Sequence, residues 1–223
     1  MQKHELHKNR MTAVIILNSP QILEKVFHQK RAETDVVICC DGGANRAFEI
    51  GVPPDFVIGD LDSLSEESRK KLSAESIVHR PSQYKTDLEK ALDFALEKGV
   101  TGVEVFGVAG GRLDHQLTNI QMLQKYAGLL RIKFYDESGY GFFIDSSAKF
   151  RAQIGQQISL IAFKRVSGVQ TQGLKYALNG ENLEWGVRDG QSNEAIEEDV
   201  EISVRKGVLT VFCVWLETSK TDE

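Results

Sequence analysis

The 223-residue sequence is poor in proline and cysteine, with four prolines and three cysteines. In a chain that is 41% hydrophobic and 26% charged, so few prolines exclude a fibrous or intrinsically disordered protein. Cys39 and Cys40 are adjacent, and Cys213 is remote from both. An odd number of cysteines at this spacing predicts neither a disulfide framework nor a paired zinc site.

Long apolar runs and an excess of positive charge are also missing. The longest apolar runs, such as 13–17, have the length of a strand and fall far short of the roughly 20 residues that a membrane-spanning helix needs. The 27 Lys and Arg residues against 32 Asp and Glu give a net charge of −5, so neither nucleic acid nor a membrane is an expected partner. Because residues 1–10 lack the apolar core of a signal peptide, we expect a cytoplasmic protein.

The pattern of the chain changes near residue 136. Before it, short β-rich runs alternate with helix-length segments, which is typical of a parallel sheet covered by helices on both faces. The strands are expected at residues 13–18, 35–41, 55–60, 77–80, 103–106 and 130–135, and the helices at 20–31, from about 43, 63–74, 86–99 and 114–126. We therefore predict an α/β domain with an αβα sandwich over residues 1–136.

The remainder of the sequence, residues 137–223, has no helical periodicity. Strand-like segments occur at 157–163, 200–205 and 208–216, and the dipeptide Lys206-Gly207 between the last two is typical of a β-hairpin turn. This pattern predicts a small all-β sandwich domain.

Aspartates fall where the predicted strands end and helices begin. They are Asp41, Asp60, Asp62, Asp87 and Asp114. The carboxyl ends of parallel strands meet at one edge of a sheet, so these side chains are expected to gather there. An extended chain through Leu61 would point Asp60 and Asp62 the same way. Crowded carboxylates repel one another, and an all-oxygen cluster favours a hard cation such as Mg²⁺. Any one of these aspartates alone is better explained as a helix cap or a turn residue, whereas all five at one predicted edge favour a metal site.

Two glycine-rich turns, 41–46 and 107–112, follow strands of the same sheet, and each ends in an arginine. Glycine allows backbone N–H groups to approach an anion closely, and arginine suits phosphate oxygens. Neither turn matches the dinucleotide fingerprint or the Walker A loop. These features favour a magnesium–nucleotide site in a phosphoryl-transfer or phosphoester enzyme and leave the substrate open.

Several strings in the sequence resemble, in order and spacing, the motifs of the thiamine pyrophosphokinase family. They are Cys40-Asp-Gly-Gly-Ala-Asn-Arg46, Gly59-Asp-Leu-Asp-Ser63, Thr86-Asp-Leu-Glu-Lys-Ala-Leu92, Gly110-Gly-Arg-Leu-Asp-His115, Gly173-Leu-Lys-Tyr-Ala-Leu178 and Ser192-Asn193. The resemblance covers the chain from about residue 12 to 216. It implies transfer of the β,γ-diphosphate of ATP to the hydroxyl of thiamine, giving thiamine diphosphate and AMP. It also implies a homodimer whose active site lies between one subunit's N-terminal domain and its partner's C-terminal domain.

The resemblance also assigns roles to residues. It implies that Asp60, Asp62 and Asp87 hold Mg²⁺, and that Arg112 and Asp114 act with them at the reacting end. The implied ATP-binding residues are Asp41, Gly42, Gly43, Asn45, Arg46, Gln83, Gly110 and Gly111, and the implied thiamine-binding residues are Tyr176, Ser192 and Asn193. The sequence departs from the family pattern at Tyr84, where many relatives carry an acid.

Two other functions are compatible with parts of the sequence. A metal-dependent phosphohydrolase could use Asp60 and Asp62, although aspartate-nucleophile phosphatases place such a pair after their first strand, and here it follows the third. A non-catalytic sensor of thiamine or nucleotide is the second alternative, and Tyr84 is the feature that hints at it. ATP alone separates the first from a transferase, because a hydrolase releases phosphate without an acceptor.

Overall fold

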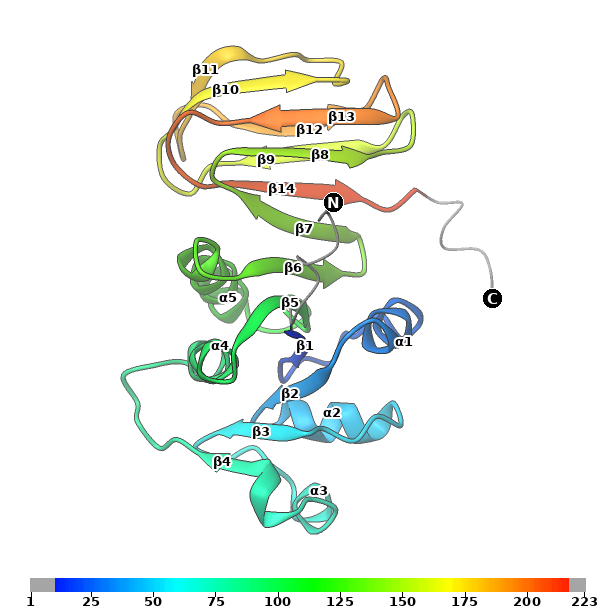
Figure 1. Ribbon diagram of the computed structural model, residues 1–223, viewed down its shortest axis with the longest axis vertical. Helices are drawn as coiled ribbons and strands as arrows, with labels where there is room; N and C mark the ends of the chain where they lie inside the picture. The colour runs from blue at the N-terminus through cyan, green and yellow to red at the C-terminus, as the bar shows by residue number, and fades with distance from the viewer. Residues whose placement is uncertain (1–10, 217–223) are drawn as a thin grey trace, which may run out of the picture. The chain divides into compact units, whose positions relative to one another are not determined.

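A computed structural model of the protein describes residues 11–216, so the outer ends of the two predicted domains, at residues 1 and 223, lie outside the described part. The chain divides into two compact units, with the boundary between Glu137 and Ser138. Each unit has its own secondary structure (Figure 1). Each also has its own buried apolar residues. None of the described helices is long and apolar enough to cross a membrane.

The first unit is an α/β domain with a parallel sheet. Its strands are β1 (Met11–Ile16), β2 (Val36–Cys40), β3 (Phe56–Gly59), β4 (Ile77–His79), β5 (Val100–Phe106) and β6 (Arg131–Asp136), in the spatial order β6-β5-β1-β2-β3-β4. Its helices are α1 (Glu24–Ala32), α2 (Gly43–Glu49), α3 (Glu66–Lys70), α4 (Asp87–Glu97) and α5 (Leu113–Tyr126), with a 3₁₀ turn at Ala74–Ser76. Figure 1 shows α1 and α2 on one face of the sheet and α4 and α5 on the other. The predicted αβα arrangement is confirmed.

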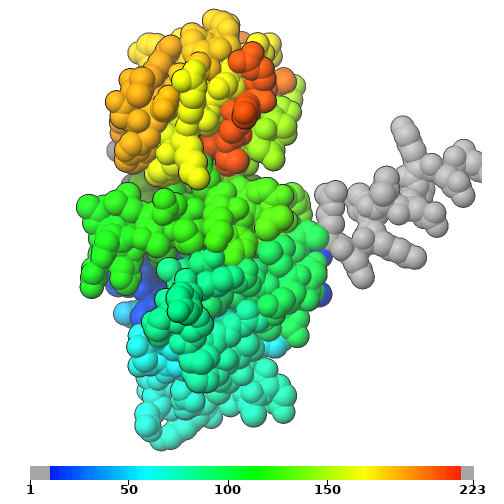
Figure 2. Space-filling view, turned by 90° about the vertical axis from the view of Figure 1, so that its left-hand side faces the viewer, coloured from blue at the N-terminus to red at the C-terminus, as the bar shows by residue number. Residues whose placement is uncertain are grey.

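The sheet is buried because helices cover it on both sides. Ala13, Val14, Ile15 and Ile16 of the central strand β1 are fully buried, which explains the continuous apolar run there. On one face, Phe27 of α1 packs edge-to-face on Phe106 of β5, with ring centroids 5.1 Å apart. Figure 2 shows the opposite face, where residues of α4 and α5, coloured teal to green, cover the strands.

The order of the strands creates a crevice for a ligand. Strand β1 pairs with both β2 and β5, so the chain runs outward from β1 in two directions. In an open parallel sheet, the loops that leave such a switch point diverge to opposite faces, and ligands bind between them at the carboxyl ends of the strands. The loops after β1 and β5 are therefore expected to frame a site.

One helix begins later than the sequence predicted. The capping residue of α3 is Ser65, whose side-chain oxygen accepts a hydrogen bond from the Ser68 amide, and not Ser63. The Ser63 amide instead donates to the Asp41 carboxylate, at 3.0 Å. The prediction was wrong here because a long-range contact holds Ser63 outside the helix. The cap of α4 is as predicted, since the Thr86 hydroxyl accepts from the Glu89 amide.

The second unit consists of two antiparallel sheets. The strands are β7 (Gly139–Ile144), β8 (Ser147–Arg151), β9 (Gln157–Ile161), β10 (Val166–Gln172), β11 (Asn179–Leu183), β12 (Gly190–Glu194), β13 (Asp199–Ser203) and β14 (Leu209–Val214). One sheet has the order β12-β9-β14-β7 and the other β11-β10-β13-β8. Leu160 and Val211 of the first and Val169 and Ile202 of the second belong to a single buried core. The predicted β-sandwich is confirmed.

The predicted hairpin at Lys206-Gly207 is wrong. Strand β13 pairs with β8 and β10, and strand β14 pairs with β7 and β9, so the two consecutive strands lie in different sheets. The backbone of Lys206 is already bonded to Ser167, whose amide donates to the Lys206 carbonyl at 2.8 Å. The dipeptide therefore carries the chain from one sheet to the other.

Candidate active site

A cavity of about 660 Å³ lies at the carboxyl ends of β1, β2, β3 and β5, where the strand order predicts a ligand crevice. Its volume is in the range typical of small-molecule sites. Several of the sequence-predicted residues line it: Asp41, Asp60, Asp62, Gln83, Asp87, Gly111 and Arg112. The structure thus brings together residues that are as far apart in the sequence as Asp41 and Arg112.

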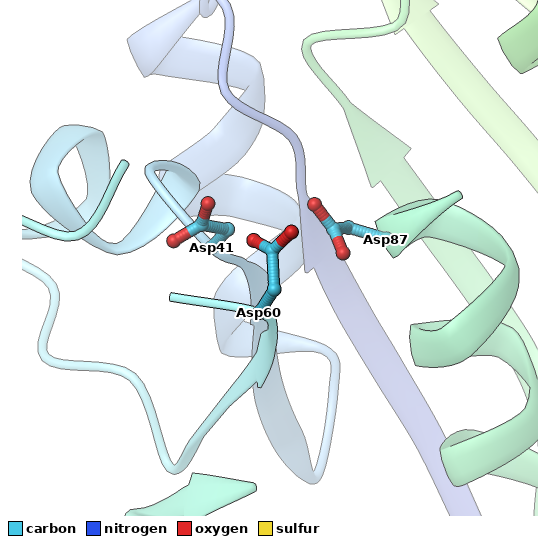
Figure 3. Close-up of side chains that lie close together, drawn as sticks. All are labelled: Asp41, Asp60 and Asp87. Carbon is cyan, nitrogen blue, oxygen red and sulfur yellow. The ribbon is translucent and has the colours of Figure 1, made fainter. Parts of the chain in front are cut away.

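Three carboxylates converge in this cavity. One oxygen from each of Asp41, Asp60 and Asp87 lies within 4.8 Å of the other two. Figure 3 shows the three side chains pointing toward one another from the ends of β2 and β3 and from the first turn of α4. Gly59 permits this approach, because a Cβ there would lie 3.0 Å from the Asp41 Cβ and 3.2 Å from an Asp87 oxygen.

Asp62 lies outside this carboxylate group, although it lines the same cavity. The chain is not extended at Leu61, which has a φ of 69° in the left-handed region. The alternation that would align Asp60 with Asp62 is therefore broken, and that expectation was wrong. The carboxylate of Asp62 instead accepts a hydrogen bond from the Ser63 hydroxyl, at 3.0 Å.

Asp41 occupies the most buried position of the carboxylate group, with 4% of its surface exposed. Its Oδ2 accepts from the Ser63 amide, but its Oδ1 has no hydrogen-bond partner among the described residues. Burial, followed by the nearby carboxylates of Asp62 and Asp87, raises the pKa of Asp41 to about 6 against the opposing hydrogen bond from Ser63. Its φ of 43° adds local backbone strain of the kind that collects at functional sites.

The other two carboxylates each have a polar partner. The side-chain amide of Gln83 donates to Asp60 at 2.9 Å, and this hydrogen bond is the main cause of the lowered pKa of Asp60. Asp87 accepts from the ammonium of Lys90, at 2.8 Å. The carboxylate group is thus held from two sides by donors.

This donor set fits a divalent cation. A buried carboxylate oxygen without a partner is costly unless a cation or donor reaches it, and Asp41 Oδ1 is such an atom. The set contains oxygen ligands only, which suits Mg²⁺ better than zinc or copper. Asp41, Asp60 and Asp87 are therefore the residues that could hold Mg²⁺ here.

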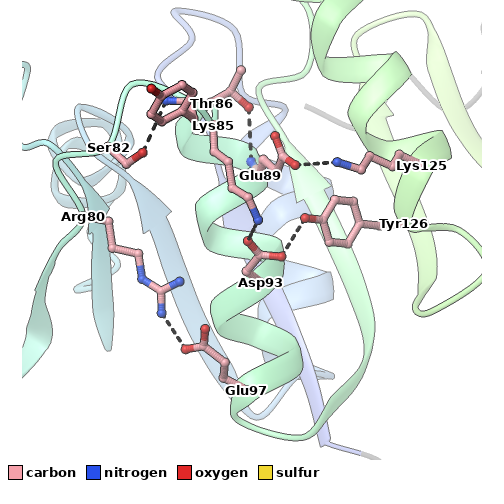
Figure 4. Close-up of polar contacts among 10 residues, drawn as sticks. Arg80, Ser82, Lys85, Thr86, Glu89, Asp93, Glu97, Lys125 and Tyr126 are labelled. Carbon is pink, nitrogen blue, oxygen red and sulfur yellow. Dashed lines mark hydrogen bonds and ion pairs between the residues drawn. The ribbon is translucent and has the colours of Figure 1, made fainter.

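The segment 80–86 carries Gln83 to the site and is anchored to α4 and α5 (Figure 4). Lys85 donates to Asp93 of α4 at 2.6 Å, and the hydroxyl of Tyr126 donates to the other oxygen of the same carboxylate at 2.6 Å. Asp93 thereby joins the segment to both helices. Further ion pairs in Figure 4 are Arg80–Glu97 and Lys125–Glu89.

The glycine-rich turn after β5 packs against the loop after β1. The Ser19 hydroxyl donates to the carbonyl of Ala109 at 2.5 Å. Gly107, with a φ of 80°, approaches the loop so closely that a Cβ would lie 3.0 Å from the carbonyl oxygen of Leu17. This turn places Gly111 and Arg112 on the cavity wall.

Arg112, which lines the cavity, forms a bidentate pair with Asp114. Arg112 Nε donates to Asp114 Oδ1 at 3.1 Å, and Arg112 Nη2 donates to Asp114 Oδ2 at 2.6 Å. The pairing with Arg112 lowers the pKa of Asp114 to about 2. Asp114 is therefore a weak proton acceptor while Arg112 holds it.

Other predicted ATP-binding residues have structural contacts instead. Asn45 bonds the carbonyl of Ser63 and the amide of Ser65, and Arg46 pairs with Glu49 at 2.7 Å. The described cavity lining does not include the predicted ATP-binding residues Gly42, Gly43, Asn45, Arg46 and Gly110, nor the predicted catalytic residue Asp114. Asn45 therefore supports the loop that bears Asp60, whereas Arg46 points to a neighbouring helix residue.

The three predicted thiamine-binding residues lie close together in the second unit. Buried Asn193 donates from its Nδ2 to the Tyr176 carbonyl at 2.8 Å and accepts from the Tyr176 amide at 3.0 Å. The Tyr176 side chain is 63% exposed. Ser192 has a φ of 56°, and its amide donates to the Ser159 hydroxyl. The buried side-chain amide of Asn193 thus fixes the backbone of Tyr176, whose aromatic ring is exposed.

Among the cavity residues that the sequence reasoning missed, Lys90 is the buried charged one. Lys90 lies one turn after Asp87 on α4 and lines the cavity, with 4% of its surface exposed. A lysine placed three residues after an acid on a predicted helix was the available signal.

Comparisons with known proteins agree over both units. The profile "Thiamin pyrophosphokinase, catalytic domain" matches residues 27–134, and "Thiamin pyrophosphokinase, vitamin B1 binding domain" matches residues 146–209. The chain is 31% identical to the thiamine pyrophosphokinase of Bacillus subtilis over 90% of this chain and 97% of that protein. It is 27% identical to thiamine pyrophosphokinase 1 of rice over 86% of this chain and 83% of that protein.

Solved structures give the same result. The crystal structure of thiamine pyrophosphokinase from Bacillus subtilis superposes with a TM-score of 0.79 at 28% identity, covering 91% of this chain and 98% of that one. The enzyme from Geobacillus thermodenitrificans gives a TM-score of 0.78 at 26% identity, covering 93% and 99%.

Proposed function

Because the chain belongs to the thiamine pyrophosphokinase family, we propose that it transfers the β,γ-diphosphate of ATP to the hydroxyl of thiamine, giving thiamine diphosphate and AMP. Membership of the family supports the conclusion that the protein is an enzyme that forms thiamine diphosphate. The observation that best supports this proposal is the convergence of Asp41, Asp60 and Asp87 in a cavity that Arg112 also lines.

Reactions of this kind depend mainly on positioning and charge neutralisation. The oxygen of the thiamine hydroxyl forms a bond to the β-phosphorus and gives up its proton to water. The bond from that phosphorus to the α,β-bridging oxygen breaks, and AMP leaves with this oxygen. When bound, Mg²⁺ would neutralise negative charge on the phosphate oxygens. Asp60 and Asp87 are the proposed ligands, together with Asp41 from the observed group or Asp62 from the family motif.

Arg112 and Asp114 have separate proposed roles. Arg112, on the cavity wall, offsets the negative charge that develops during transfer. Asp114 orients Arg112 through its two hydrogen bonds, because a carboxyl with a pKa of about 2 accepts a proton poorly near neutrality. The glycine-rich turn 107–112 presents backbone N–H groups to the phosphates.

Thiamine is proposed to bind through Tyr176, Ser192 and Asn193. The exposed Tyr176 ring offers a π-face to the thiazolium cation, and Asn193 holds the backbone beneath it. We also propose the homodimer and the cytoplasmic location that the sequence suggested. If the active site is shared between subunits, the specific activity will fall on dilution below the dimer dissociation constant.

Product analysis tests the reaction. The full-length protein is incubated with ATP, Mg²⁺ and thiamine, and the products are separated by ion-exchange chromatography. Equal amounts of AMP and thiamine diphosphate support the proposal, whereas ADP with thiamine monophosphate contradicts it. Asp60→Asn and Asp87→Asn serve as inactive controls that exclude a contaminating enzyme.

The same assay separates the two alternatives. Phosphate released from ATP without thiamine would indicate the metal-dependent phosphohydrolase. Binding of thiamine or ATP by calorimetry with no product would indicate the non-catalytic sensor. The second outcome would give weight to Tyr84, whose side chain is 99% exposed and stands where many relatives carry an acid.

A further inference from the structure

Lys90 is the only lysine or arginine that is buried among residues 11–216. It lies on α4, and its ammonium contacts Asp87 Oδ1 at 2.8 Å on the wall of the cavity. Burying an ammonium is costly unless opposite charge surrounds it. The Asp87 carboxylate provides that charge by direct contact, and the Asp41 and Asp60 carboxylates lie beside Asp87.

The negative charges of the carboxylate group exceed the positive charge of Lys90. The carboxylates of Asp41, Asp60 and Asp87 outnumber the ammonium of Lys90, and Asp62 lines the same cavity, so the site keeps an excess of negative charge that a divalent ion can offset. Without Lys90, three carboxylate oxygens within 4.8 Å of one another would repel without compensation.

We propose that Lys90 is a positioning residue that acts as a counter-cation of the metal site. It holds Asp87 in place before any metal arrives and keeps the affinity of the carboxylate group for free Mg²⁺ low. Mg²⁺ then enters with its nucleotide, whose phosphates add the negative charge that Lys90 offsets. The inference rests on the Mg²⁺ site of the proposed function.

The test measures metal binding without turnover. The melting temperature of the full-length protein is recorded against increasing MgCl₂ in the absence of nucleotide, for wild type and Lys90→Met. We expect the metal-free variant to melt at a lower temperature and to gain more from Mg²⁺. The Mg²⁺ concentration at half-maximal shift should fall by about tenfold or more, since a positive charge beside the ion has been removed.

Three further variants isolate the charge. Lys90→Gln keeps a hydrogen-bond donor and should shift as Lys90→Met does, and it replaces that variant if Lys90→Met fails to fold. Lys90→Arg keeps the charge and should resemble wild type. Lys125→Met removes a lysine of α5 that pairs with Glu89 of α4. Neither residue lines the cavity, so this variant should leave the Mg²⁺ midpoint unchanged.

Two results would overturn the inference. The first leaves the proposed function intact, and the second also removes its metal site. If Lys90→Met and Lys90→Gln melt earlier but show the wild-type Mg²⁺ shift and midpoint, Lys90 merely packs the helix, and the proposed function is unaffected. If wild type shows no Mg²⁺ shift and no heat of Mg²⁺ binding, with or without ATP, the metal site of the proposed function fails as well.

Discussion

The guanidinium of Arg112 and the carboxylate of Asp114 face each other in a two-bond pair, with Nε–Oδ1 and Nη2–Oδ2 distances of 3.1 and 2.6 Å. Only one residue separates them, where the glycine-rich turn leads into α5. The pairing keeps Asp114 ionised and fixes the direction of the guanidinium. A phosphate that enters the cavity therefore meets an arginine that is already oriented.

Asp114→Asn should lower kcat/KM by about tenfold to a hundredfold through loss of this orientation. The wild-type Asp114 carboxyl has a pKa of about 2 and does not titrate near neutrality. The ratio of wild-type to variant kcat/KM should therefore stay constant between about pH 5 and about pH 9. A ratio that rises with pH through this range would instead identify Asp114 as the titrating base.

Asp41→Asn should stabilise the metal-free protein while it impairs activity. Asn tolerates the left-handed backbone at this position, and its side-chain oxygen can still accept from the Ser63 amide. The wild-type pKa is raised to about 6, so the folded state binds this proton more tightly than the unfolded state does. The protonated Asp41 carboxyl therefore contributes favourably to the free energy of unfolding. This contribution is full below about pH 4 and is lost as the pH rises through about 6.

The stability gain of Asp41→Asn should accordingly grow between about pH 4 and about pH 6 and then level off at on the order of 2–3 kcal/mol. Urea unfolding in the presence of a chelator measures it. Asp35→Asn, at an exposed acid that bonds Thr12 in the same unit, is the comparison. A constant difference between Asp41→Asn and wild type at all pH values would contradict the environment assigned to Asp41.

Much of the site could be predicted from the sequence, because its acids follow strands whose apolar patterns are clear. Which acids converge could not be predicted, since that depends on backbone conformation. Asp41 and Leu61 have φ angles of 43° and 69°, and neither residue type reveals a left-handed turn in advance. These two turns bring Asp41 to Asp60 and Asp87 and leave Asp62 outside the carboxylate group.

The two errors in the fold have a similar origin. Ser63 and Lys206-Gly207 match local signals for a helix cap and a hairpin, but each is already engaged by a distant partner. Ser63 bonds Asp41, and Lys206 bonds Ser167 in a different part of the chain. Local signals predict a conformation only where no such tertiary contact competes.

Asn193→Ala should destabilise the protein by about 2–4 kcal/mol, because the buried amide bonds both backbone groups of Tyr176. Tyr176→Ala should change stability by less than about 0.5 kcal/mol, since its ring is exposed. If Tyr176 contacts thiamine, its variant should raise KM for thiamine and leave KM for ATP unchanged. An unchanged thiamine KM in Tyr176→Ala would remove this residue from the thiamine site.

Gly43→Ala should cost about 3 kcal/mol or more, because a Cβ there would lie 2.3 Å from the carbonyl oxygen of Ile16. Gly111→Ala is the matched control, since nothing lies within 4 Å of its Cβ position. Thermal melting compares the two variants. Similar melting temperatures would show that α2 can move away from β1, contrary to the close packing described.

The fate of labelled phosphorus tests the proposed reaction most directly. The protein is given Mg²⁺, thiamine and ATP carrying ³²P at either the α or the γ position. Transfer of an intact diphosphate predicts that the α label appears only in AMP and the γ label only in thiamine diphosphate. Appearance of the α label in ADP, or of the γ label in free phosphate without thiamine, would contradict the account.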